Sequence, residues 1–170
     1  MACKPVALDH VNIFVRNAER SHRWYTDVFG LHTQDTMTFP ATGKLRAAFL
    51  ACDRDHAHDI ALFEVGEDAP GPQKKGVGLN HVAWRMGSLE DLAEMYHRLK
   101  AKDVPISVSD HTVSIGIYFG SDGNGLEVYY EQPRSEWNRE RPFSGAGLEG
   151  PVPGPWDEMI QQAPPAFARA

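Results

Sequence analysis

The sequence predicts an α+β protein made of two βαβββ modules that follow one another along the chain. The first observation is that the order strand, helix, strand, strand, strand occurs twice within 170 residues. The second is a β-hairpin pattern near the end of the second module, where apolar and β-branched residues flank Ser-Asp-Gly-Asn-Gly. The third is that one constant offset superposes identical residues of the two halves: Leu8 on Leu79, His10 on His81, Val11 on Val82 and Tyr25 on Tyr96. We therefore expect an internal duplication that buries one shared core.

The first module is predicted over residues 5–66. Its first strand alternates in polarity, which places one set of side chains on one face: Leu8, His10, Asn12 and Phe14. An apolar stripe favours a helix after it, and Gly30 is the expected C-terminal cap. The predicted strand, helix and three further strands cover residues 6–15, 18–29, 36–39, 45–51 and 58–65.

The second module is predicted over residues 78–133, after a linker at 67–77 that is rich in Gly, Pro and charge. Its helix begins with Ser88-Leu-Glu-Asp, which is similar to a capping box. The predicted strand, helix and three further strands cover residues 79–85, 88–102, 104–108, 113–119 and 125–131. Residues 1–133 are expected to form a single domain, and 134–170 a Pro- and Gly-rich C-terminal extension without long regular elements.

Composition limits the function classes. A hydrophobic fraction of 42% with 10% aromatic residues is typical of a folded protein. The formal net charge of −6, without a Lys- or Arg-rich block, argues against nucleic acid or anionic lipid as a partner. No apolar run approaches the roughly 20 residues of a membrane span, and the first residues lack the apolar core of a signal peptide. We expect a cytoplasmic protein that binds a small molecule.

The run Tyr118-Phe-Gly-Ser-Asp-Gly-Asn-Gly-Leu-Glu127 resembles the motif Tyr-Phe-x-Asp-Pro-Asp-Gly-Asn-x-x-Glu of the vicinal-oxygen-chelate superfamily. That superfamily includes glyoxalase I, bleomycin- and fosfomycin-resistance proteins and type I extradiol dioxygenases. This chain is one residue shorter within the motif and lacks the proline. A histidine at the first strand of each module adds to the resemblance, which covers residues 5–133.

The resemblance implies that the two modules pair into a half-open barrel around a cup that holds a divalent metal. The implied metal ligands are His10, His81 and Glu127. Two imidazoles and one carboxylate form the facial triad of non-haem iron(II), so iron(II) is the preferred ion, and manganese(II) would also suit.

Two further runs resemble extradiol dioxygenases. His58-Asp-Ile-Ala-Leu-Phe-Glu64 is similar to their strand that begins His-Asp-Val-Ala-Phe, and Asp110-His111-Thr-Val-Ser-Ile-Gly-Ile-Tyr118 is similar to Asp-His-Gly-Val-Ser-x-Ser-Ile-Tyr of one-domain members. The resemblance implies proton transfers for His111, orientation of a substrate hydroxyl for Tyr118, and deprotonation or anchoring of the other hydroxyl for His58. It implies an extradiol dioxygenase that cleaves a catechol-like aromatic diol with O2 and assembles as a homo-oligomer.

Other functions remain open at this point. Glyoxalase I uses a fourth ligand, a glutamate from the strand before the second histidine, so Glu64 facing the metal would favour an isomerase or lyase. Alternation places Leu62 and Glu64 on one face, without showing which face that is. A metal-free binding protein of the bleomycin-resistance type is a third reading, although it has no need of three ligands. His10 and His81 could also be hydrogen-bonded core residues.

Overall fold

The chain divides into two compact units, Met1–Lys74 and Lys75–Ala170, and the division falls inside the predicted linker at 67–77. The computed structural model describes residues 4–73, 76–111 and 113–137. Among these residues, no helix is both long and apolar enough to cross a membrane.

The first unit has one four-stranded sheet with the strand order β1-β4-β3-β2. Strands β1 and β4 are parallel, and the other neighbours are antiparallel. Its elements are β1 (Val11–Val15), α1 (Ala18–Trp24), a π-helical turn η1 (Tyr25–Phe29), β2 (His32–Thr38), β3 (Leu45–Ala51) and β4 (Ile60–Glu64). The side chain of Asn17 caps α1 by accepting a hydrogen bond from the backbone N–H of Arg20, and Gly30 ends η1 with a φ of 81°.

The second unit repeats this topology in a sheet with the order β5-β8-β7-β6. Here too the first and last strands, β5 and β8, are parallel, and the other pairs are antiparallel. Its elements are β5 (Val82–Arg85), α2 (Leu89–Ala101), β6 (Ser107–Asp110), β7 (Ser114–Ser121), β8 (Asn124–Glu131) and a short 3-10 helix η2 (Arg134–Glu136). As predicted, Ser88 caps the helix: its hydroxyl accepts a hydrogen bond from the backbone N–H of Asp91.

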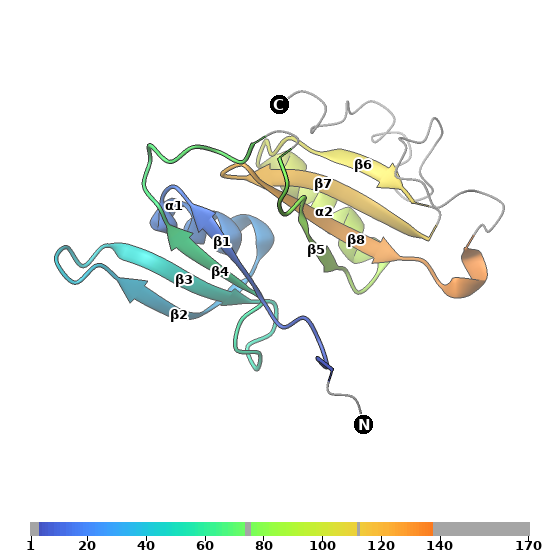
Figure 1. Ribbon diagram of the computed structural model, residues 1–170. Coiled ribbons are helices and arrows are strands. Elements are labelled where there is room, and N and C mark those ends of the chain that lie inside the picture. The colour runs from blue at the N-terminus through green and yellow to red at the C-terminus, as the bar shows by residue number, and fades with distance from the viewer. Residues whose placement is uncertain (1–3, 74–75, 112, 138–170) are drawn as a thin grey trace. The chain divides into compact units, whose positions relative to one another are not determined.

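Each sheet buries the face that its helix covers (Figure 1). In the first unit the buried apolar side chains include Ile13, Val15, Tyr25, Leu50, Ile60 and Leu62. In the second unit they include Leu92, Tyr96, Leu99, Ile117, Phe119, Leu126 and Val128. Burying a large apolar side chain contributes about 1.5–3 kcal/mol, so the helix-facing side holds each unit together. The opposite face of each sheet is available for polar side chains.

The first strand is shorter than predicted, because it begins at Val11 and not at residue 6. Its parallel partner β4 begins only at Ile60, opposite Val11, so the residues before Val11 have no strand to pair with. Leu8 is accordingly 86% exposed.

Strand β6 is also displaced from its prediction, from 104–108 to Ser107–Asp110. The backbone N–H of Val104 closes the end of α2 by donating to the carbonyl of Leu99, and Pro105 has no N–H to give to a strand. The prediction for β3 matches the structure, and β2 begins four residues earlier than predicted.

The turn between β7 and β8 is a two-residue hairpin loop. Asp122 and Gly123 have φ values of 55° and 86°, and positive φ at both positions is the signature of a type I′ turn. The turn places Ser121 opposite Asn124 and, further along the ladder, Tyr118 opposite Glu127. A shift of one residue would turn one of these two side chains to the other face of the sheet.

The α+β class and the duplicated βαβββ module are confirmed. The pairing of the modules into a half-open barrel, and the single domain over 1–133, stay predictions. The predicted extension at 134–170 is described only through Trp137, and the rest of it lies outside the described residues.

Candidate functional site

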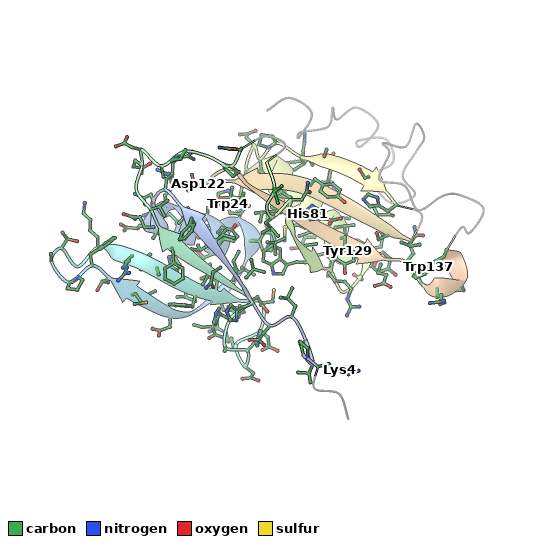
Figure 2. All side chains as sticks on the ribbon, viewed as in Figure 1. Lys4, Trp24, His81, Asp122, Tyr129 and Trp137 are labelled. Atoms are coloured by element: carbon green, nitrogen blue, oxygen red, sulfur yellow. The ribbon has the colours of Figure 1, made fainter. Side chains whose placement is uncertain are left out.

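The second unit brings His81 and Glu127 together. His81 directly precedes β5, and β5 pairs with β8 so that Ala83 lies opposite Glu127. Because side chains alternate along a strand, His81 shares a face with Ala83 and Glu127. Nε2 of His81 is 3.0 Å from Oε2 of Glu127. Figure 2 labels His81 among the side chains of this unit.

Glu127 is a buried carboxylate with only 7% of its surface exposed. Gly116 of β7 makes room for it, since a Cβ atom at this position would collide with Oε1 of Glu127. A buried carboxylate is costly unless it is paired and hydrogen-bonded. In this structure its partners are the imidazole of His81 and the phenol of Tyr118.

Tyr118 and His111 lie beside this pair. The phenol oxygen of Tyr118 is 2.7 Å from Nε2 of His111. Burial raises the pKa of Tyr118, and its hydrogen bond to Glu127 raises that pKa further. The phenol therefore stays protonated, and its O–H donates a hydrogen bond to the carboxylate of Glu127. The phenol oxygen can then accept a hydrogen bond from an N–H of His111.

Ring contacts fix the orientation of Tyr118. Its ring makes edge contacts with His81, at 5.4 Å between centroids, and with His111, at 5.9 Å. Four of the six predicted site residues are therefore neighbours in the second unit: His81, His111, Tyr118 and Glu127.

The remaining two predicted site residues, His10 and His58, are neighbours in the first unit. Their rings are 4.2 Å apart, and His58 also makes an edge contact with Phe49 at 5.3 Å. Burial lowers the pKa of His58, and repulsion from His10 lowers it further. His58 is therefore suited to be a neutral imidazole that can accept a proton.

Three polar residues that were not selected as site residues form a series of contacts that begins at His10. Asp9 lies 3.4 Å from Nδ1 of His10 and 3.3 Å from Nε2 of His56, and Nδ1 of His56 is 2.9 Å from Asp59. Hydrogen bonds with Asp59 and with Asp9 raise the pKa of His56. Asp59 follows His58 in the run that resembles extradiol dioxygenases, whereas Asp9 and His56 belong to no quoted motif. The only sequence signal is that a polar residue, Asp9 or Asn80, precedes the histidine in both modules.

Glu64 faces the helix side of the first sheet. Its Oε2 accepts a hydrogen bond from the backbone N–H of Ala18 at 2.9 Å, in the first turn of α1. Leu62, on the same face, is fully buried in the core. Phe49 contacts His58 from the opposite face, as the pairing of Phe49 with Ala61 shows. Glu64 therefore does not share a face with the His58 cluster, which argues against a four-ligand site of the glyoxalase type.

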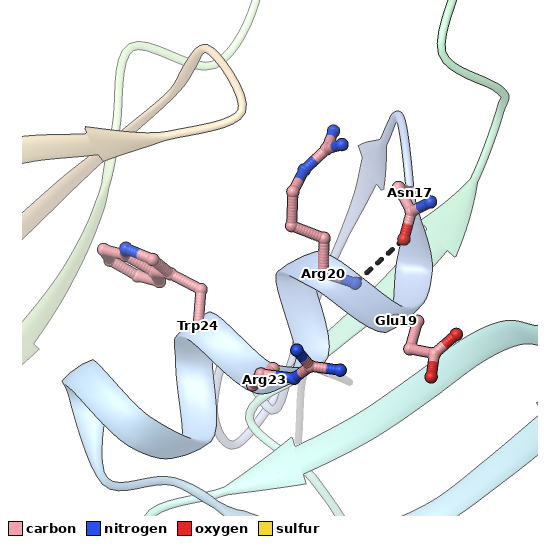
Figure 3. A pocket seen from close by; sticks show the side chains of 5 residues that line it. All are labelled: Asn17, Glu19, Arg20, Arg23 and Trp24. Carbon is pink, nitrogen blue, oxygen red and sulfur yellow. Dashed lines mark hydrogen bonds between the residues drawn. The ribbon is translucent and has the colours of Figure 1, made fainter.

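A pocket of the first unit lies on the helical layer (Figure 3). The residues that line it belong to α1 and its cap: Asn17, Glu19, Arg20, Arg23 and Trp24. Arg20 of this group also forms an ion pair with Glu67 at 2.8 Å. None of the predicted site residues lines this pocket.

Within the described ranges, no three His, Cys, Asp or Glu side chains are gathered so as to hold a metal ion. His81 and Glu127 form a pair, and His10 belongs to the other unit. The donor set of the pair nevertheless fits a divalent metal. An imidazole nitrogen faces a buried carboxylate oxygen, and the other nitrogen of the same ring is hydrogen-bonded to Asn80.

The sequence profile of the Glyoxalase/Bleomycin resistance protein/Dioxygenase superfamily matches residues 7–128. The chain therefore belongs to this superfamily.

Among curated proteins, the chain is 29% identical over 136 residues to a catechol-2,3-dioxygenase of Bacillus subtilis, covering 79% of this chain and 45% of that protein. It is 34% identical over 109 residues to biphenyl-2,3-diol 1,2-dioxygenase 3 of Rhodococcus globerulus, covering 62% of this chain and 53% of that protein. The chain thus spans about half the length of these two relatives.

Solved structures support the fold. A glyoxylase/bleomycin resistance protein/dioxygenase domain from Frankia sp. EAN1pec matches with a TM-score of 0.62 at 18% identity, covering 76% of this chain and all of that one. The fosfomycin resistance protein FosX of Listeria monocytogenes, in complex with Mn(II) and sulfate, matches with a TM-score of 0.56 at 18% identity, covering 78% and 98%. A lactoylglutathione lyase from Agrobacterium tumefaciens has a TM-score of 0.53 at 22% identity, covering 74% and 94%. At sequence identities this low, the structural similarity shows the fold but does not show the reaction.

Proposed function

We propose that this chain is a metal-dependent extradiol dioxygenase that opens the ring of a catechol-like aromatic diol with dioxygen. The observation that carries the proposal is the hydrogen-bonded His111–Tyr118 pair beside His81 and Glu127. The names of the curated relatives, which are dioxygenases of catechol and of biphenyl-2,3-diol, support it.

The proposed metal ligands are His10, His81 and Glu127, with iron(II) preferred and manganese(II) as the second choice. The pair in the second unit supplies one imidazole and one carboxylate. The repeat-equivalent position in the first module supplies the second imidazole, from His10. A divalent ion held by this set would act as a Lewis acid and keep positions free for a diol and for dioxygen.

The proposed proton chemistry rests on His111, Tyr118 and His58. His111 is within hydrogen-bonding distance of the phenol of Tyr118, so a proton can move between the imidazole and a substrate oxygen near that phenol. Because its raised pKa keeps Tyr118 protonated and its O–H is donated to Glu127, the phenol oxygen would orient a substrate hydroxyl by accepting a hydrogen bond from it. His58, whose pKa is lowered, is the proposed acceptor for the proton of the other hydroxyl. Assembly as a homo-oligomer stays a prediction.

A direct test is to reconstitute the chain with iron(II) without oxygen and then to offer catechol and 2,3-dihydroxybiphenyl in aerated buffer. The proposal predicts a yellow ring-fission product with at least one of these diols. A chain that binds the metal but converts no diol, and instead isomerises a hemithioacetal, would contradict the proposal and favour the glyoxalase reading. A chain that binds no metal would favour the binding-protein reading.

Replacing Gly116 with alanine tests whether Glu127 must keep its place. The new methyl group would meet Oε1 of Glu127, the end of a flexible side chain, so we expect the carboxylate to move and the fold to survive. Losing the support of a metal ligand typically costs about 10–100-fold in metal affinity, and we expect a loss of at least that order for Mn(II). Gly78→Ala is the control, because a Cβ there meets nothing within 4 Å. Unchanged Mn(II) affinity of Gly116→Ala would remove Glu127 from the metal site.

A further inference from the structure

The residue before each proposed ligand histidine has a polar side chain, and this side chain contacts the Nδ1 atom of the histidine. Asn80 precedes His81, and Oδ1 of Asn80 is 2.6 Å from Nδ1 of His81. Asp9 precedes His10, and Oδ2 of Asp9 is 3.4 Å from Nδ1 of His10. We propose that Asn80 and Asp9 are positioning residues that hold Nδ1 of these histidines and direct Nε2 to the metal. This inference rests on the metal site of the proposed function.

The two nitrogens of His81 have different partners. Nδ1 faces the amide oxygen of Asn80, and Nε2 faces Oε2 of Glu127 at 3.0 Å. With a metal bound between Nε2 and Glu127, a neutral imidazole whose single N–H is on Nδ1 and is donated to Asn80 would leave the lone pair of Nε2 for the ion. Without a metal, Nε2 is within hydrogen-bonding distance of the buried carboxylate with which it would share the ion. Histidine ligands in metalloproteins are commonly held in this way through the nitrogen that does not bind the metal.

The backbone at Asn80 is fixed by strand β8. Gly125 packs so closely against it that a Cβ atom at Gly125 would collide with the carbonyl oxygen of Asn80 and would lie 3.2 Å from Cβ of His81. Strand β8 therefore fixes the backbone position from which the side chain of Asn80 reaches the ring of His81. The glycine that follows Asn124 in the hairpin motif is thus part of the support of His81.

In the first unit the equivalent support is ionic and involves three residues. Asp9 contacts His10 through Oδ2 and His56 through Oδ1, and His56 in turn contacts Asp59. Oδ2 of Asp59 accepts a hydrogen bond from the backbone N–H of Cys52 at 2.7 Å, which ties this group to the end of β3. The two modules thus place an acceptor at the same sequence position, an amide in one and a carboxylate in the other. An incidental contact would not be expected to recur at the same place in both repeats.

The orientation of His81 can be observed without metal. The ring of His81 makes an edge contact with Tyr118, at 5.4 Å between centroids and 82° between planes. An aromatic neighbour at this distance displaces the NMR signals of the ring protons of His81. If Asn80 holds the ring, Asn80→Ala should move these signals toward the positions of a freely rotating histidine, and Asn80→Asp should leave them displaced.

The second readout is the affinity for Mn(II), measured by the electron paramagnetic resonance signal of the free ion. We expect Asn80→Ala to lose about 10–100-fold in affinity, as is usual when a ligand histidine loses its hydrogen-bond partner. Asn80→Asp, which copies the arrangement of the first module, should restore most of it. Asp9→Ala should lose less, because its contact with His10 is longer. Asn17→Ala is the control for general loss of stability: it removes the cap of α1 and should leave the Mn(II) affinity unchanged.

The two proposals fail in different ways. If Asn80→Ala keeps both the displaced His81 signals and the Mn(II) affinity, the positioning role of Asn80 is wrong. If Asn80→Asp behaves like Asn80→Ala, the role as a hydrogen-bond acceptor is wrong. If the unaltered chain shows the displaced signals and loses them in Asn80→Ala, but binds no metal, the positioning role stands and the metal site of the proposed function is wrong.

Discussion

Replacing Glu127 with glutamine is expected to abolish metal binding while leaving the fold intact. Glutamine has nearly the same shape as glutamate but lacks the negative charge, and the carboxylate is buried next to Nε2 of His81. Losing only an outer partner of a metal ligand already costs about 10–100-fold in affinity, so the loss of the carboxylate itself should exceed about 100-fold. His81→Ala should behave in the same way. Iron content after anaerobic reconstitution measures both effects, and turnover should fall with it.

The matched control is Glu131→Gln. Glu131 lies on the same strand and the same face as Glu127, but its side chain is exposed and forms a long ion pair with Arg85, at 3.8 Å. Full iron content in Glu127→Gln would remove the triad hypothesis. Equal losses in Glu127→Gln and Glu131→Gln would point to a general loss of surface charge instead of a lost ligand.

Removing His111 should have the opposite signature, with metal retained and turnover lost. His111→Ala should keep full iron content and lower kcat by about 10²–10⁴-fold, which is the usual range for a positioned acid or base. Tyr118→Phe keeps the ring contacts with His81 and His111 and removes only the hydroxyl. We expect it to weaken diol binding as well as kcat, because the phenol would orient a substrate hydroxyl.

Two substitutions away from the site serve as controls for this pair. His97→Ala changes an exposed histidine of α2, and Tyr130→Phe removes a hydroxyl from β8 on the face opposite Glu127. Both should leave kcat unchanged. Turnover of His111→Ala equal to that of the unaltered chain would refute the role of His111. Loss of iron in Tyr118→Phe would mean that Tyr118 acts by holding Glu127 and not by contacting substrate.

Alternation along strands predicted the face of the sheet on which Glu127 lies. It put Glu127 on the polar face of its strand, and the structure places His81 and Tyr118 beside it. The relation of Tyr118 to Glu127 depends on the length of the turn, and this turn departs from the family motif. The left-handed φ values of Asp122 and Gly123 give the two-residue turn that keeps Tyr118 opposite Glu127.

Other features depend on tertiary packing that one sequence does not encode locally. Alternation placed Leu62 and Glu64 on one face of the sheet but could not say which face α1 would cover. The hydrogen bond from the backbone N–H of Ala18 to Glu64 shows that α1 covers the face that carries Leu62 and Glu64. The start of the first strand could not be predicted from the local sequence either. It is set by pairing with Ile60, which lies on a strand far along the chain. His56 lies in the turn between β3 and β4, and its contacts with Asp9 and Asp59 arise only when this turn meets the residues before β1.

Oxygen consumption is the most direct measure of the proposed reaction. With iron(II)-loaded protein and a catechol-like diol, an oxygen electrode should record uptake that requires both metal and diol and that equals the amount of ring-opened product formed. Glu127→Gln prepared in the same way should consume no oxygen beyond that of free iron(II). Conversion of the diol without oxygen uptake, or uptake that is the same in Glu127→Gln as in the unaltered chain, would contradict the assignment of this chain as an extradiol dioxygenase.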